Sequence, residues 1–202
     1  MSSKVTFALV KHNQTMLIIV SGPDRVGKST LIKRICDDAK VPTFVSHHGA
    51  PPKKQETIFD FYKEDVLKFK ASGAKLGIFD RAWPCSFILE QHRRRNLGHL
   101  EDLVDFELWL NDQDLPVVHL AQFRPWHWSA PLHVEELREE GHKGWFLRDE
   151  FVARMQEHKV YTDQLQIFYE EITMFPSVVL AETVSGSNAV ALCKQAILND
   201  SR

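Results

Sequence analysis

Residues 16 to 30 contain the feature that most constrains how this chain can fold. The segment begins with the continuously apolar run MLIIV and continues with GPDRVGKST, which satisfies the pattern G-x-x-x-x-G-K-[ST]. The helix-compatible stretch LIKRI comes next. In this pattern, glycines let backbone N–H groups face phosphate oxygens, and the following helix points its positive N-terminal end at the same place. The segment therefore predicts a phosphate-binding loop between a buried strand and a helix. Its residues are Gly22, Pro23, Asp24, Arg25, Val26, Gly27, Lys28, Ser29 and Thr30.

The rest of the chain alternates short apolar runs with segments of helical period. The runs that resemble buried strands cover residues 16–20, 43–45, 76–79, 116–120 and 177–180. Helical periodicity covers residues 29–39, 55–71, 84–96, 100–111, 148–174 and 188–199. Strands that alternate with helices indicate an α/β fold, in which right-handed crossovers connect the strands of a parallel sheet. We therefore expect a five-stranded parallel sheet with helices on both faces.

The length and composition favour one domain. The 202 residues, 44% of them hydrophobic, can bury a full core, and their number is typical of a single domain. We assign that domain to residues 16–202 and treat residues 1–15 as an N-terminal extension. Residues 122–147 interrupt the alternation with three tryptophans, two prolines and several charges around a short helical stretch flanked by loops. This segment is predicted to be a mobile lid.

Charge, hydropathy and cysteine content exclude several classes of protein. With 27 acidic and 25 basic residues, the formal charge of −2 lacks the positive field that polynucleotide binding needs, so we expect no polynucleotide partner. No stretch of about 18 apolar residues is present, and residues 1–14 resemble no secretion signal, so the expected location is cytoplasmic, away from membranes. The three cysteines form no C-x-x-C pair, which argues against a zinc site or a redox couple.

Four residues complete the predicted chemistry of the site. Lys28 supplies a mobile cation, and Ser29 offers a hydroxyl to Mg²⁺, the ion that bridges the terminal phosphates of a nucleotide. Asp80 ends the apolar run 76–79, where a second Mg²⁺ ligand is expected; the alternative is that it caps the helix that begins near Pro84. Arg81 follows directly and presents a guanidinium suited to bidentate phosphate binding.

GPDRVGKST and the pair Asp80-Arg81 together resemble the thymidylate kinase family, in which the loop often reads G-x-D-R-x-G-K-S-T and the third strand ends in D-R. The resemblance implies a three-layer P-loop kinase fold with sheet order 2-3-1-4-5, ATP and Mg²⁺ as cofactors, and a homodimer. It also implies that Asp24 contacts the 3′-hydroxyl of the acceptor sugar and that Arg25 stabilises the phosphoryl group in transfer. Catalysis would then fall to Arg25, Lys28 and Asp80.

The acceptor pocket implied by this resemblance departs from the family pattern. The family motif F-P-x-R appears as APPK, with Lys53 in place of arginine, and aromatic-x-x-x-Arg survives only from Phe59 to a lysine. Trp83 replaces the aromatic residue after D-R, and Gln91 takes the place of a base-reading glutamine. Core packing is the alternative for Phe59 and Trp83, and an exposed helix position is the alternative for Gln91. The departures are similar to those of divergent, virus-encoded members.

The resemblance implies ATP- and Mg²⁺-dependent phosphoryl transfer to a nucleoside or deoxynucleoside monophosphate, such as dTMP or a related dNMP, which becomes the diphosphate. Arg138, Lys143, Arg148 and Arg154 are candidates to close the lid on the phosphates. Two alternatives stay open. One is a deoxynucleoside kinase that phosphorylates a 5′-hydroxyl, and the other is a P-loop protein that binds ATP as a switch without kinase activity.

Overall fold

The computed structural model describes residues 15–48, 58–93 and 99–200, and within them it contains a five-stranded parallel sheet in the order β2-β3-β1-β4-β5. The strands are β1 (Met16–Ser21), β2 (Thr43–His47), β3 (Leu76–Asp80), β4 (Val117–Gln122) and β5 (Ser177–Leu180). The expected strand number, parallel direction and order 2-3-1-4-5 are confirmed.

The central strand β1 has partners on both sides. Met16 is opposite Leu76 of β3, and Leu17 is opposite Val117 of β4. Because both edges of β1 are paired and both faces are covered, all six of its residues are buried, which explains the continuous apolar run in the sequence. The N-terminal extension before this strand lies outside the described residues, apart from residue 15.

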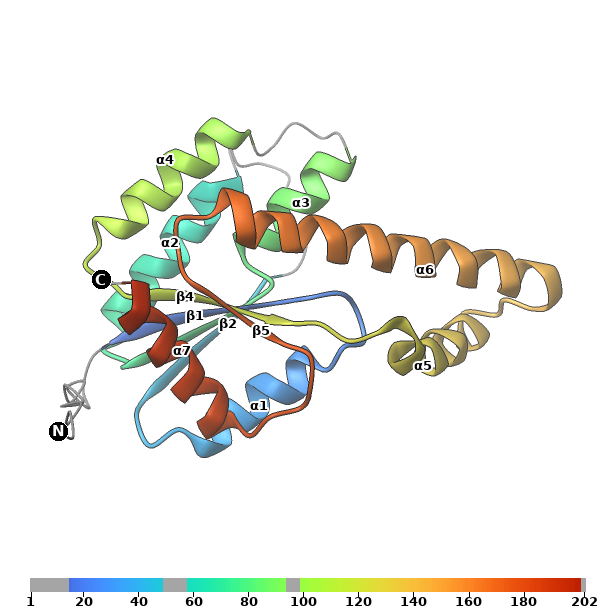
Figure 1. Cartoon of the computed structure of the whole chain (residues 1–202), viewed down its shortest axis with the longest axis horizontal. Helices are drawn as coiled ribbons and strands as arrows, with labels where there is room; N and C mark the ends of the chain where they lie inside the picture. Colours follow the sequence, from blue (N-terminus) through green and yellow to red (C-terminus); the bar gives the residue numbers. More distant parts are fainter. Residues whose placement is uncertain (1–14, 49–57, 94–98, 201–202) are drawn as a thin grey trace, which may run out of the picture.

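Helices cover both faces of the sheet (Figure 1). One face carries α1 (Lys28–Asp38) and α7 (Gly186–Asp200). The other carries α2 (Ile58–Ala71), α3 (Trp83–Arg93), α4 (Leu100–Asn111) and the end of α6 (Gly144–Ile167), which continues into a π-helical turn, η1 (Phe168–Ile172). The molecule thus has the expected three layers.

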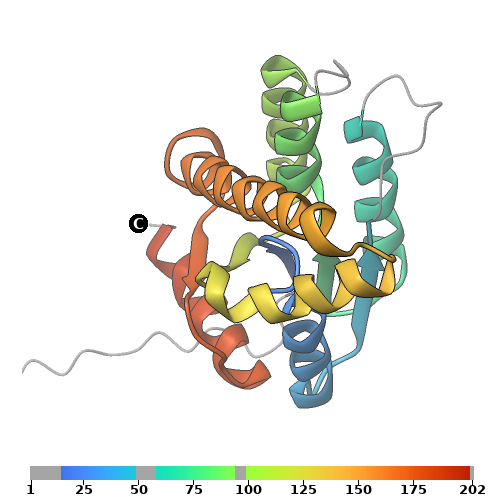
Figure 2. The ribbon, with the colours of Figure 1, turned by 90° about the vertical axis from the view of Figure 1, so that its right-hand side faces the viewer.

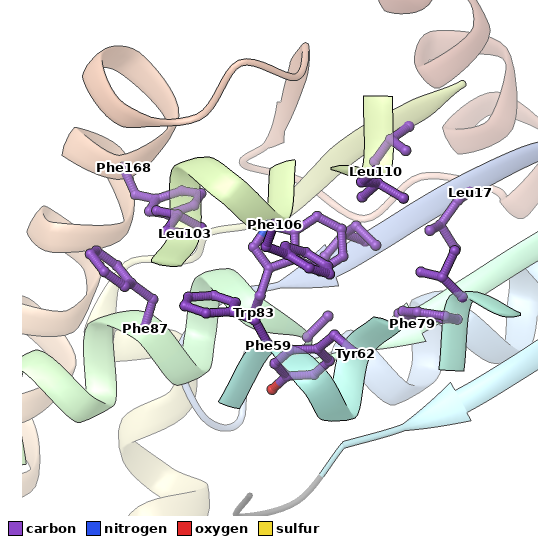
Figure 3. Packing of buried hydrophobic residues seen from close by; sticks show 14 of the residues in the cluster. Leu17, Phe59, Tyr62, Phe79, Trp83, Phe87, Leu103, Phe106, Leu110 and Phe168 are labelled. Atoms are coloured by element: carbon purple, nitrogen blue, oxygen red, sulfur yellow. The ribbon is translucent and has the colours of Figure 1, made fainter. Parts of the chain in front are cut away.

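The two faces of β1 lead into two separate cores. Leu17 and Ile19 belong to the larger one, which is rich in aromatic side chains from α2, α3, α4 and η1 (Figure 3). Ile18 and Val20 point to the opposite face, where α1 and α7 pack with aliphatic side chains. Successive side chains of a strand point to opposite faces, so this one strand anchors both halves of the hydrophobic core.

The remaining helix, α5 (Trp126–Glu139), pairs with α6 to form a helical hairpin that projects beyond the carboxyl ends of the strands. In Figure 2 the hairpin, residues 126–167, crosses in front of that edge of the sheet. The expectation of a short helical stretch flanked by loops was wrong in extent, because α5 has 14 residues despite Pro131 within it, and α6 begins at Gly144, four residues before the predicted start. The role of residues 122–147 as a mobile lid stays a prediction.

Within the described part of the chain, no helix has the length and apolar character needed to cross a membrane.

Candidate functional site

The predicted phosphate loop lies between β1 and α1, at the carboxyl edge of the sheet. Gly22 and Gly27 have φ values of 141° and 96°, which L side chains rarely adopt. A Cβ atom on Gly22 would lie 2.2 Å from the carbonyl oxygen of Gln122 at the end of β4, so only glycine lets the loop pass there. The backbone conformation therefore explains both glycines of the motif, and the close approach of Gln122 is a second reason for glycine at position 22.

Lys28 is held inside this loop before any phosphate is bound. Its Nζ donates to the carbonyl oxygens of Gly22 at 2.8 Å and Pro23 at 2.5 Å, and the residue is only 5% exposed. Burial lowers the pKa of this ammonium, and the nearby positive charge of Arg81 lowers it further. The carboxylate of Asp24 is farther away, at 4.0 Å, so the direct hydrogen-bond acceptors of this buried cation are neutral carbonyls that an anion could replace.

Asp24 and Arg81 come together from the loop and from the end of β3 through an ion pair between Arg81 Nη2 and Asp24 Oδ1. Arg81 and the loop residue Arg25 have φ values of 59° and 62°, which non-glycine residues seldom adopt. Such conformations persist only where surrounding structure enforces them, and they gather at functional sites. The geometry thus brings together two of the residues predicted from the sequence, Asp24 and Arg81.

Asp80 lies at the same edge and is 5% exposed. Its Oδ2 is 2.7 Å from Nδ1 of His47 at the end of β2, while its Oδ1 is buried without a hydrogen-bond partner. The pairing with His47 is not the helix-capping arrangement that was the alternative for this aspartate. Ser29, in the first turn of α1, is exposed.

Asp80 and Ser29 could supply part of the ligand set of a Mg²⁺ ion. The free oxygen of Asp80 is the kind of hard oxygen ligand that this ion prefers, and the hydroxyl of Ser29 is another. In the described ranges no cluster of three or more histidine, cysteine or acidic residues could hold a metal ion alone. Phosphate oxygens of a nucleotide would have to supply the remaining ligands, as is usual for Mg²⁺.

The helical hairpin contacts the phosphate loop through a chain of ion pairs. Arg25 Nη2 is 2.5 Å from Oε1 of Glu136 on α5. The other oxygen of Glu136 is 2.9 Å from Arg154 on α6, which also reaches Glu140 at 2.7 Å. The hydrogen bond from Arg25 lowers the pKa of Glu136 below its usual value. Arg154 is thus the candidate lid cation that this network connects to the loop.

A pocket with a volume of about 180 Å³ lies beside the phosphate loop. Its lining comes from the loop, α1 and the segments that follow β4 and β5. The lining residues are Gly27, Thr30, Leu31, Arg34, Gln122, Arg124, Thr183 and Val184. Arg124 donates to Thr183 across the pocket and lies over the ring of Trp128, 5.7 Å from its centre.

The sequence interpretation did not include the residues after β5 in any site. The signal that could have found them is their position, since ligands of open parallel sheets bind outside the carboxyl ends of the strands. Arg124 was noticed only as one of the charges in the 122–147 segment. Its place directly after β4 gives it the same positional signal.

Two predicted substrate contacts are corrected by the structure. Phe59 is 1% exposed and Trp83 is 0% exposed, and both lie in the larger core. The indole Nε1 of Trp83 donates to Glu107 at 3.0 Å, which satisfies its polar atom internally. The alternative of core packing therefore applies to both. Lys53 lies outside the described residues, and Gln91 lies on α3 in a part whose side chains the structure does not describe.

A second polar cluster at the end of β2 was missed. His48 is 1% exposed, and its Nε2 lies 2.7 Å from Oδ2 of Asp65 on α2. The hydroxyl of Ser46 donates to the same oxygen at 2.6 Å. The adjacent His47 pairs with Asp80, so the two histidines point to different carboxylates. Their place at the end of a strand was the available signal.

No protein-family model and no curated protein sequence matches this chain. Solved structures do. Polyphosphate kinase 2 from Arthrobacter aurescens TC1 superposes with a TM-score of 0.54 at 16% identity, over 95% of this chain and 69% of the other. The YorR protein from Bacillus subtilis, solved in complex with phosphorylated GDP, superposes with a TM-score of 0.52 at 16% identity, over 93% of this chain and 99% of the other.

The chain has the fold of P-loop kinases. At 16% identity these similarities establish the fold and leave the reaction to be argued from the site itself.

Proposed function

We propose that this protein transfers the terminal phosphoryl group of ATP, with Mg²⁺, to a small phosphorylated acceptor. The observation that carries the proposal is that Asp24 lies beside both Lys28, at 4.0 Å, and Arg81 at the carboxyl edge of the sheet, with Arg25 next to it in the loop. Phosphoryl transfer needs positioning and charge stabilisation more than covalent catalysis, and these side chains offer both.

The donor nucleotide would lie along the loop, with its phosphates at the N-terminus of α1 and its base end in the pocket beside Thr30 and Arg34. Lys28 would exchange the carbonyl oxygens of Gly22 and Pro23 for phosphate oxygens. Mg²⁺, when bound, neutralises charge on the phosphates.

The acceptor that we propose is a deoxynucleoside monophosphate, dTMP or a related dNMP, which would become the diphosphate. Its phosphate oxygens already carry negative charge near neutral pH, so no base is needed to activate them. Arg81 would bind this phosphate, and Asp24 would accept a hydrogen bond from the sugar hydroxyl. Their ion pair in the free protein holds the two side chains beside each other, ready for such a ligand. Lys53 would be a further contact.

A second candidate, a kinase that phosphorylates a hydroxyl group, is favoured by one observation. His47 pairs through Nδ1 with the buried carboxylate of Asp80, its Nε2 has no hydrogen-bond partner among the described residues, and the side chain is 68% exposed. A carboxylate that holds one imidazole nitrogen can orient the other to accept a proton from a hydroxyl. A hydroxyl acceptor needs that help, whereas a phosphate acceptor does not.

One assay separates these functions from each other and from an ATP-dependent switch. The purified protein is incubated with ATP and Mg²⁺, and ADP formation is measured with a panel of ribo- and deoxynucleoside monophosphates and with the corresponding nucleosides. We expect acceptor-dependent ADP formation with monophosphates, above all dTMP. Transfer only to nucleosides would support the second candidate, and ATP turnover that ignores every acceptor would support a switch.

Variants of the loop test the assigned roles in the same assay. Lys28→Ala is expected to lower turnover by about 100-fold or more, because one preorganised charge at the transferring group is worth that much. Arg25→Ala should also lower turnover strongly. Arg81→Ala should chiefly raise the KM for the acceptor. Lys33→Ala is the matched control, since Lys33 lies on the same helix but contacts only Asp37 at the surface.

A further inference from the structure

Two histidines, one from each helix of the hairpin, contact the same tryptophan. His133 lies on α5 and is 5% exposed, and His158 lies on α6. The indole of Trp126 contacts both. Its ring stacks on that of His133 with 4.7 Å between centres and an interplanar angle of 22°, and it meets the ring of His158 edge-on at 5.2 Å.

The polar atoms of this pair are unusually unsatisfied. Both ring nitrogens of His133 and Nε2 of His158 are buried and have no hydrogen-bond partner in the described part of the protein. Oε2 of Glu136 is 3.9 Å from Nδ1 of His133, which is too far for a hydrogen bond. Each buried unpaired polar atom costs about 1–3 kcal/mol, so three on one surface call for an explanation, such as a ligand.

The charged groups around His133 connect it to the phosphate loop. Burial lowers the pKa of His133, and the positive charge of Arg154 on α6 lowers it further; Glu136 on its own helix raises it. From the loop, Asp24 raises this pKa and Arg25 lowers it. Arg25 is also bonded directly to Glu136, one turn along α5 from His133.

His158 is near enough to the loop for loop charges to affect its pKa. Burial is the largest cause that lowers its pKa, and His133 across the hairpin acts in the same direction. Asp24 raises the pKa of His158, and Lys28 lowers it. The two histidines thus lie near the residues that are expected to bind the terminal phosphates: His133 is next to Glu136, which pairs with Arg25, and His158 shares the contact with Trp126.

We propose that His133 and His158 form a phosphate-binding subsite on the hairpin, which holds the terminal phosphoryl group of ATP on the side away from the loop. The proposal rests on the proposed function, since it assigns new ligands to the same nucleotide. Each imidazole would donate from a nitrogen that has no partner in the free protein. Unlike an arginine, an imidazole can gain its charge when the anion arrives.

Proton uptake should therefore accompany nucleotide binding. Burial lowers the pKa values of both imidazoles and so favours their neutral forms. A phosphate anion favours the protonated form and raises these pKa values in the complex. Between the free and bound pKa values, binding takes up protons, so the affinity falls as pH rises, by up to about tenfold per pH unit for each histidine.

Calorimetry on the wild-type protein tests this coupling directly. The β,γ-imido analogue of ATP is titrated with Mg²⁺ at pH 7 in buffers of different ionisation enthalpy, and the slope of the binding enthalpy gives the number of protons taken up. We expect the wild type to take up more protons on binding than the His133→Phe, His158→Gln double variant. Protonation of the nucleotide itself is the same in both experiments, so it cancels in this comparison. Equal uptake in the two proteins would overturn the proposal.

Single variants locate the effect. His158→Gln and His133→Phe, which keeps a ring to stack on Trp126, should each raise the Kd for the ATP analogue about fivefold and leave the Kd for ADP within about twofold, because one charge-assisted hydrogen bond is worth about 1 kcal/mol or more. His127→Asn is the matched control, since His127 is an exposed histidine on the same helix.

The outcomes separate this proposal from the proposed function. Circular dichroism and a thermal melt verify that each variant is folded. If the His133 variant does not fold, the His158 variant and the number of protons that the wild type takes up still test the proposal. If the histidine variants lost affinity for ADP and for the ATP analogue to the same extent, or for neither, the proposed subsite would be wrong. A wild-type protein that binds the nucleotide but transfers no phosphoryl group would instead overturn the proposed function alone.

Discussion

At the scale of single residues, Gly22 shows how strongly one position can depend on having no side chain. Its φ of 141° belongs to a region open essentially to glycine, and a Cβ atom would overlap the carbonyl oxygen of Gln122. We expect Gly22→Ala to lower the free energy of unfolding by about 2–5 kcal/mol, from backbone strain plus overlap, and to abolish measurable ATP binding.

Gly73→Ala is the control for this prediction. Gly73 also has a positive φ, 71°, but an added Cβ would meet nothing within 4 Å. Only the backbone strain of about 1–2 kcal/mol should then appear in urea denaturation, with ATP binding intact. If the two variants were equally destabilised, overlap with Gln122 would have no measurable effect.

Because His119 is buried, we expect the free energy of unfolding to decrease in acid. It is fully buried in β4, and burial lowers its pKa to about 3. In the unfolded chain this pKa returns to about 6.5, so between these values the unfolded state binds the extra proton and the folded state does not. Acidification below pH 6.5 should therefore reduce the free energy of unfolding by about 1.4 kcal/mol per pH unit through this residue alone.

The measurement is urea denaturation from pH 7.5 to pH 5 for the wild type and for His119→Asn. Other titrating groups, including His48, His133 and His158, are common to both proteins and cancel in the difference. The difference in stability should shrink as the pH falls, because only the wild type loses the contribution of a neutral His119. A pH-independent difference would show that this histidine does not titrate on unfolding.

At the scale of elements, the hairpin and the phosphate loop are joined by Glu136. Its carboxylate neutralises Arg25 and Arg154 and places a negative charge where phosphates are expected. We predict that Glu136→Gln lowers the KM for ATP, by up to about fivefold, because a partly exposed ion pair of this kind contributes about 0.2–1 kcal/mol. Stability should change by less than about 1 kcal/mol for the same reason.

Glu140→Gln is the matched control for this variant. Glu140 contacts Arg154 but not the phosphate loop, so its neutralisation should leave the KM for ATP nearly unchanged. Steady-state kinetics on both variants decide the point. A higher KM in Glu136→Gln would mean that Glu136 positions Arg25 for the nucleotide instead of competing with it.

The elements themselves were largely predictable, and the reason differs between them. β1 and β3 were evident because burial on both faces selects continuous apolar residues. Helix α5 was not, because its sequence mixes Trp126, Pro131 and charged residues and has only one side against the protein. It is held by contacts with α6 rather than by a pattern of its own, and the lid function predicted for this region stays a prediction.

At the scale of the whole molecule, nucleotide binding should stabilise the entire fold, since the loop, β4 and the hairpin all border the proposed site. With ATP and Mg²⁺ at about 100 times Kd, the expected gain is about 2.7 kcal/mol. For a domain of this size that corresponds to a rise in Tm of about 5–10 °C. Differential scanning fluorimetry should show it for the wild type and not for Lys28→Ala; a shift of equal size in that variant would argue against binding at the loop.

The homodimer implied by the resemblance to thymidylate kinases also stays a prediction at this scale. Sedimentation velocity at several protein concentrations would measure it directly. A species of about twice the 23.3 kDa mass of the chain is the expected result.

The candidate site residues could be predicted where they lie in one continuous segment of the sequence. They could not be predicted where they come from segments that only folding brings together. Loop residues such as Lys28 and Asp24 are recognisable because backbone geometry and ligand contacts come from one continuous segment. Phe59 and Trp83 were misassigned as substrate contacts because an aromatic side chain has the same sequence signature in a core as in a binding site. Burial distinguishes the two, and burial depends on neighbours that are distant in sequence.

The amino-acid sequence alone determined the phosphate loop, the five strands and their parallel arrangement, because these depend on local spacing and on hydrophobic period. Only the tertiary structure decided that Arg25 meets Glu136, that Asp80 meets His47, and that His133 and His158 contact Trp126 with nitrogens that have no partner among the described residues. Such contacts join residues up to 111 positions apart, and no local pattern records which side chains the packing of helices on a sheet will bring together.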